Sequence, residues 1–131
     1  MRLVLLFTGF LLLGSCKQGE KPIPERSALS EYSQIFLGNR LFSEKTCITC
    51  HDTYKKKTGP SIKEIMKVYK TKNGDIFAFL KGDAEPIVDT TASQVAIMQD
   101  NINVFLKGVS DEELKTINTY MLHVDGLNPD K

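Results

Sequence analysis

Residues that hold metals or form disulfides are scarce in this 131-residue chain, which contains three cysteines and two histidines. A structural zinc site needs a second pair of ligands, but outside residues 47–51 only Cys16 and His123 remain. Long alternating runs of apolar and polar residues are also missing, which argues against a thioredoxin-like βαβ unit. The 17 basic and 16 acidic side chains nearly balance, which argues against a protein that binds nucleic acid.

No apolar stretch near the start of the chain is long enough to span a bilayer comfortably. The run from Leu3 to Leu13, with Arg2 before it, instead has the layout of a secretion signal. Its end, the sequence LGSC closing on Cys16, resembles a bacterial lipobox. The resemblance implies a lipoprotein signal peptide over residues 1–15 and a lipid anchor on Cys16, which would place the mature protein on the outer side of a membrane, in the periplasm of a bacterial cell envelope. The alternative is an ordinary signal peptide with an incidental cysteine.

The five residues from Cys47 to His51, CITCH, form the attachment sequence of c-type haem. Each thiol can add across one haem vinyl group to form a thioether, and the adjacent imidazole then reaches the iron as the proximal ligand. We therefore expect one covalent haem c on Cys47 and Cys50, with His51 bound to the metal. With Cys16 assigned to lipid, no disulfide is needed.

Apolar residues at helical spacing predict short helices on both sides of the motif. The first is expected over residues 29–43, leading into the motif. Ser61 followed by Glu64 is a capping-box pattern that predicts the start of a second helix. Asn73 is expected to cap a third helix, which Gly82 ends.

The second half of the chain is predicted to hold a long loop and a final helix. Residues 82–93 have no period and are expected to form a loop, and the apolar residues 95–98 are treated as loop-like before a helical turn at 101–105. Ser110 and Glu113 repeat the capping-box spacing at the start of the last helix. One face of that helix carries the apolar residues Leu114, Ile117, Met121 and Val124.

These patterns divide the chain into a signal peptide (1–15), a flexible tether (16–29), a folded domain (30–126) and a C-terminal tail (127–131). The tether is polar and contains two prolines. The domain is predicted to be all-α, with four to five short helices around one covalently attached haem. Because so short a chain has a modest core of its own, we expect proper folding only with the cofactor present.

From Ser30 to Val124 the chain resembles the small monohaem class I cytochromes c. The resemblance rests on the haem motif, on Gly59-Pro60 after it, and on the SDEEL start of the last helix at Ser110. It implies that the Pro60 carbonyl accepts a hydrogen bond from His51, although a simple Gly-Pro turn would explain these two residues as well. It also implies that the first and last helices cross near the haem.

The matching positions at that crossing are Gly38 or Phe42 on the first helix and Tyr120 on the last, and ordinary core packing explains them equally. The sixth iron ligand is expected to be a methionine sulfur. Met66 and Met121 lie on apolar helix faces and are assigned to the core. Met98 lies in a loop-like segment 47 residues past His51, where the resemblance implies the ligand of a class I cytochrome, so Met98 is the expected ligand. The chain departs from the family at the residue after Met98, which is Gln99 here and often a proline in the family. The alternative that His123, the second histidine of the chain, is the sixth ligand stays open.

With both axial positions filled, the expected function is that of a monomeric single-electron carrier between membrane or periplasmic redox proteins, not an enzyme. The alternatives are a haem enzyme or gas sensor with an open sixth position, and an electron-transfer subunit of a larger oxidoreductase. Eight lysines face two acids over residues 45–72, whereas four lysines face ten acids over residues 73–131. Such an asymmetry would steer a charged partner, unless these are ordinary solvated faces.

Overall fold

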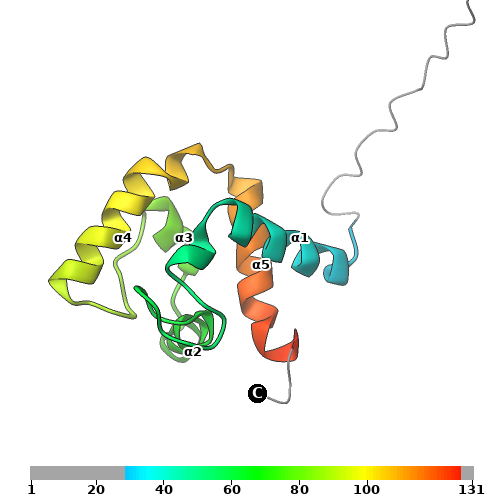
Figure 1. Ribbon diagram of the computed structural model, residues 1–131, viewed down its shortest axis with the longest axis horizontal. Helices are drawn as coiled ribbons and strands as arrows, with labels where there is room; N and C mark the ends of the chain where they lie inside the picture. Colours follow the sequence, from blue (N-terminus) through cyan, green and yellow to red (C-terminus); the bar gives the residue numbers. More distant parts are fainter. Residues whose placement is uncertain (1–28, 128–131) are drawn as a thin grey trace, which may run out of the picture.

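This computed structural model describes residues 29–127, which contain five α-helices and two short 3₁₀-helices (Figure 1). In chain order they are α1 (Glu31–Glu44), η2 (Cys47–Thr49), α2 (Ile62–Lys72), α3 (Ile76–Lys81), α4 (Ala92–Val104), η3 (Leu106–Gly108) and α5 (Asp111–Leu127). Within these residues the only β pairing is one isolated bridge between His51 and Lys56. The predicted all-α fold is confirmed.

Several sequence-based expectations concern residues outside this range. The signal peptide, Cys16, the tether up to residue 28 and the end of the C-terminal tail lie beyond the described residues. Of the helices that are described, none combines the length and the apolar character needed to cross a membrane.

Local capping sets the starts of α1, α2 and α5. Ser30 Oγ accepts from the Ser33 amide at 3.2 Å, and Ser61 Oγ accepts from the Glu64 amide at 3.2 Å. At α5 the capping box is reciprocal, because the Glu113 amide donates to Ser110 Oγ at 3.3 Å and the Ser110 amide donates to Glu113 Oε2 at 2.9 Å. The helix starts predicted at Ser61 and Ser110 are thus confirmed.

The predicted cap of the third helix was wrong by two residues. Asp75 is the N-cap of α3, and its carboxylate accepts from the Ala78 amide at 3.0 Å. Asn73 instead ends α2 in the left-handed region with φ 50°, a conformation that asparagine tolerates better than most residues. Gly82 ends α3 as expected, with φ 83°.

The segment around Met98 was also predicted wrongly, because it is helical rather than loop-like. α4 runs without interruption from Ala92 to Val104, and Met98 lies in its middle. No glycine or proline interrupts this stretch, so nothing prevents a helix from forming. The preceding residues 82–91 do form the expected connection, although it ends slightly earlier than predicted.

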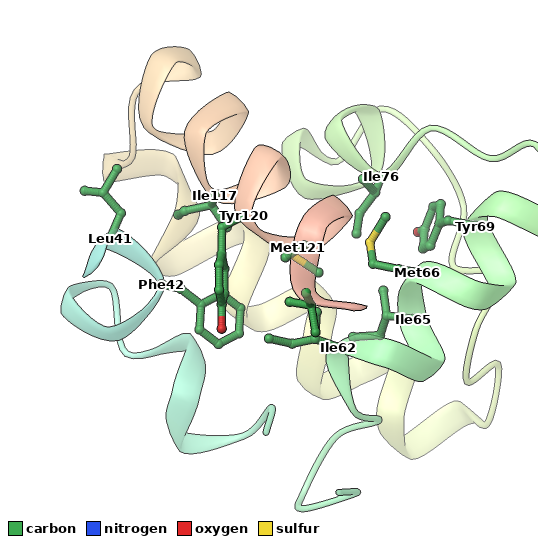
Figure 2. Close-up of a cluster of buried hydrophobic side chains, with 11 residues drawn as sticks. Leu41, Phe42, Ile62, Ile65, Met66, Tyr69, Ile76, Ile117, Tyr120 and Met121 are labelled. Atoms are coloured by element: carbon green, nitrogen blue, oxygen red, sulfur yellow. The ribbon is translucent and has the colours of Figure 1, made fainter. Parts of the chain in front are cut away.

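The helices α1 and α5 cross and pack more extensively than any other pair (Figure 1). Gly38 makes the close approach possible, since a Cβ at this position would lie 2.6 Å from Tyr120 Cβ and would also meet the Thr116 carbonyl oxygen. Next to it, the rings of Phe42 and Tyr120 pack at 5.6 Å between centroids (Figure 2). The structure therefore uses both Gly38 and Phe42 against Tyr120.

A single apolar core joins α1, α2, α3 and α5 (Figure 2). Its members are Leu41, Phe42, Ile62, Ile65, Met66, Tyr69, Ile76, Ile117, Tyr120, Met121 and Val124. None of these residues comes from α4, whose one buried residue is Ile102 and whose closest packing is with η3. The core is therefore complete on one side of the molecule, while α4 stands on another (Figure 1).

Candidate haem-binding site

A tight turn brings the two cysteines and the histidine of the motif together. Thr46 adopts the left-handed region with φ 61° and begins the 3₁₀-helix η2. The amides of Cys50 and His51 both donate to the Cys47 carbonyl oxygen, at 3.2 and 3.0 Å. One turn of chain thus directs all three side chains toward a common cavity.

The two motif cysteines are free thiols and partly buried in the structure. Burial raises the pKa of the Cys47 thiol, and the nearby Cys50 adds to this effect. Thr49 Oγ1 lies 3.7 Å from Cys50 Sγ. No disulfide joins the pair, so both sulfur atoms are available for thioether bonds.

The ring of His51 is held in one orientation and one tautomer. Its Nδ1 lies 2.8 Å from the Pro60 carbonyl oxygen, and because a carbonyl can only accept, Nδ1 must carry the proton. In the neutral ring, Nε2 then has the lone pair that binds a metal. Gly59 packs directly against the ring, since a Cβ at this position would lie 2.5 Å from His51 Cε1.

The loop after the motif is fixed by its own hydrogen bonds, which place Gly59 and Pro60 next to the ring of His51. The Gly59 amide donates to the Cys50 carbonyl oxygen at 3.0 Å. The carboxylate of Asp52 accepts from the amides of Tyr54 and Lys55, both at 2.9 Å. These two amides lower the pKa of Asp52, so its carboxylate is ionised and can accept both hydrogen bonds at neutral pH.

The cavity in front of His51 has largely apolar walls. One wall is the motif itself, and others come from α2, α3, α4, α5 and the connection around residues 86–88. Side chains from the core that also line it are Phe42, Ile65, Tyr69, Ile76, Ile117 and Met121 (Figure 2). Walls of this kind suit a large apolar macrocycle.

The chemistry of the walls fits haem c in two respects. Two thiols and an oriented imidazole lie on the same side of the cavity. The hydroxyl of Tyr69, on another wall, is buried without a hydrogen-bond partner among the described residues, which suits a cofactor whose propionates are acceptors. Burial, with a smaller contribution from Asp75, raises the pKa of Tyr69 to about 12, so this hydroxyl stays protonated.

The candidate sixth ligands occupy different places. Met98 is partly buried on α4 and lines the cavity. Met121 also lines it but is a core residue of α5 with 6% exposure, whereas Met66 belongs to the core and does not line the cavity. His123 lies elsewhere, with Nε2 2.8 Å from Glu31 Oε1.

Sequence reasoning missed the residues that join α4 to the loop after the motif. Gln94 Nε2 donates to the Thr58 carbonyl oxygen at 3.1 Å, and Lys56 Nζ lies 3.6 Å from Asp89 Oδ2. These pairs are far apart in the chain and carry no local pattern. The only signal was the position of Gln94 one helical turn before Met98, which becomes visible once the segment is known to be a helix.

Comparison with known proteins agrees with this geometry. No curated protein matches the chain. A family model described as cytochrome c, however, matches residues 36–125, a span that holds the motif, its carbonyl partner and all five α-helices in whole or in part. Because the match covers more than half of the sequence, the chain belongs to the cytochrome c family, whose members typically carry electrons on a covalently bound haem c.

Proposed function

We propose that this protein is a single-electron carrier whose haem iron is bound by His51 and Met98, and that a lipid on Cys16 holds it at the outer side of a membrane. Its partners are redox proteins of the membrane or periplasm. The observation that carries the proposal is the orientation of His51, whose Nδ1 is committed to the Pro60 carbonyl at 2.8 Å while Met98 lines the same cavity.

When bound, haem c supplies an Fe(III)/Fe(II) couple that accepts and releases one electron. The residues of the chain bind the cofactor, orient its histidine ligand and exclude water. Cys47 and Cys50 hold the macrocycle, the Pro60 carbonyl fixes the imidazole and raises its basicity, and the apolar walls keep water from the site. Met98, which lines the cavity, would supply a thioether sulfur to the iron, and such a ligand would raise the reduction potential.

Attachment is tested by denaturing electrophoresis of the mature holoprotein. Haem should migrate with the polypeptide, and the double variant Cys47→Ser, Cys50→Ser should release it. Haem that separates from the unmutated protein would rule out covalent binding by this motif.

Ligation is tested by absorption spectroscopy of the ferric protein. Methionine sulfur on six-coordinate low-spin iron gives a weak near-infrared charge-transfer band, which an open or bis-histidine site lacks. We expect this band in the wild type and its loss in Met98→Ala, together with new binding of cyanide. If the band is missing from the wild type, the alternative of a haem enzyme or gas sensor with an open sixth position gains support.

The lipid anchor is tested by fractionation. Two or three acyl chains hold a protein firmly on a membrane, whereas a single chain does so only marginally. The wild type should therefore sediment with membranes, and Cys16→Ser should be soluble or remain an uncleaved precursor. An unchanged distribution of Cys16→Ser would show that membrane attachment has another cause.

A further inference from the structure

Two polar contacts join the start of α4 to the loop that follows the haem motif. The first is the hydrogen bond of Gln94 Nε2 to the Thr58 carbonyl oxygen, at 3.1 Å. The second is the ion pair between Lys56 and Asp89, at 3.6 Å. Asp89 in turn accepts from the amide and hydroxyl of Thr91, at 3.2 and 2.8 Å. Because Thr91 is the N-cap residue of α4, both contacts act on the same end of the helix.

That end of α4 has little other support in the described part of the chain. Its N-cap residue makes no side-chain capping bond, and the one buried residue of the helix, Ile102, lies in the C-terminal half. The closest packing of α4 is with η3, which also follows its C-terminal end. The two polar contacts are therefore the hydrogen bond and the ion pair that tie the N-terminal half of α4 to the loop after the haem motif.

Gln94 lines the same cavity as the motif and Met98. It precedes Met98 by four residues on the same helix, so the two side chains share one face, and both line the cavity. Its partner Thr58 directly precedes Gly59, which contacts the His51 ring, and Pro60, whose carbonyl oxygen accepts from His51 Nδ1. A continuous path of contacts thus links the two axial side chains without passing through the cofactor.

We propose that Gln94 is a positioning residue, which sets the reach of Met98 toward the iron by fixing α4 to the segment that also orients His51. The inference rests on the proposed ligation by His51 and Met98. Without the Gln94 hydrogen bond, the N-terminal half of α4 moves more freely and the sulfur leaves the iron more often. An external ligand then competes more successfully for the sixth position.

The test measures cyanide binding to the ferric holoprotein and the intensity of the sulfur charge-transfer band. Gln94→Leu removes the donor, and Gln94→Glu keeps the size of the side chain but replaces the amide by a carboxylate, which at neutral pH can only accept. Loss of one neutral hydrogen bond should raise the affinity for cyanide about two- to tenfold in both variants. The sulfur band should weaken in parallel.

The matched control is Gln99→Leu, the same substitution on the same helix at an exposed residue that does not line the cavity. This variant should bind cyanide like the wild type. The inference is overturned if both Gln94 variants also match the wild type in affinity and band, or if they only lose stability toward denaturant. Failure of the ligation itself is recognised separately, because Met98→Ala would then leave the band unchanged.

Discussion

Replacement of Gly59 by alanine probes the support of the haem histidine directly. The added Cβ would lie 2.5 Å from His51 Cε1 and 2.9 Å from Nδ1, whereas ordinary contacts begin at 3.4 Å. The ring would have to retreat by about 0.9 Å, the difference between 3.4 and 2.5 Å. Such a shift would move Nδ1 from its 2.8 Å contact with the Pro60 carbonyl out of the normal range of hydrogen-bond distances, which ends at about 3.2 Å.

The expected cost combines two effects. Overpacking costs about 1–3 kcal/mol and the lost hydrogen bond about 0.5–1.5 kcal/mol. The free energy of unfolding of the holoprotein should therefore fall by about 1.5–4.5 kcal/mol in a denaturant titration followed by haem absorbance. The reduction potential should also rise, because a less basic imidazole stabilises ferric iron less.

Gly108→Ala is the control for this prediction, since a Cβ at Gly108 would meet nothing within 4 Å. It should change stability by no more than about 0.5 kcal/mol. A Gly59→Ala protein with the stability and reduction potential of this control would refute the view that Gly59 and Pro60 hold the histidine.

Three further predictions concern the rest of the fold. Gly38→Ala should lower the free energy of unfolding by about 1–3 kcal/mol, although alanine favours helices, because its Cβ meets α5 at Tyr120 and Thr116; a gain in stability would contradict the close crossing. Met66→Ala should cost about 2–5 kcal/mol, since this core residue is 4% exposed, and should leave the sulfur band intact; loss of the band would move the sixth ligand to Met66. The pKa of Glu113 lies below its usual value of 4.5, chiefly because of the hydrogen bond from Lys45 and secondly because of the one from the Ser110 amide. The ionised carboxylate therefore stabilises the fold above pH 4.5, and this contribution is lost as the pH falls through the lowered pKa. Unfolding titrations of Glu113→Gln between about pH 5 and pH 3 should consequently show a weaker pH dependence than the wild type; equal slopes would show that the Lys45 contact adds no stability.

Features of the fold that depend on neighbouring residues could be predicted from the sequence. Ser61 and Ser110 begin helices because each bonds an amide three residues later, and that pattern is visible in four letters. The three haem-motif residues are equally local. At Asn73 the same reasoning failed, because asparagine suits both ends of a helix, and Asp75 two positions later made the better N-cap.

The position of α4 could not be predicted for a different reason. Apart from the buried Ile102, its apolar residues line the cavity or remain exposed, with Ile97 at 43% and Val104 at 69% exposure. The usual periodicity of a half-buried helix is therefore weak. The contact of Gln94 with Thr58 spans 36 positions and depends on the tertiary fold, so no short pattern announces it.

The absence of α4 from the apolar core bears on how the protein matures. Since the cluster of α1, α2, α3 and α5 closes without α4, these helices have a common core to assemble on while the two thiols of the motif are still free. On the side of α4 the cavity is therefore walled by a helix that takes no part in this core, and a flat cofactor would meet least packing there. A helix outside the core can be displaced without breaking the core, so access to Cys47 and Cys50 would not require the other four helices to come apart.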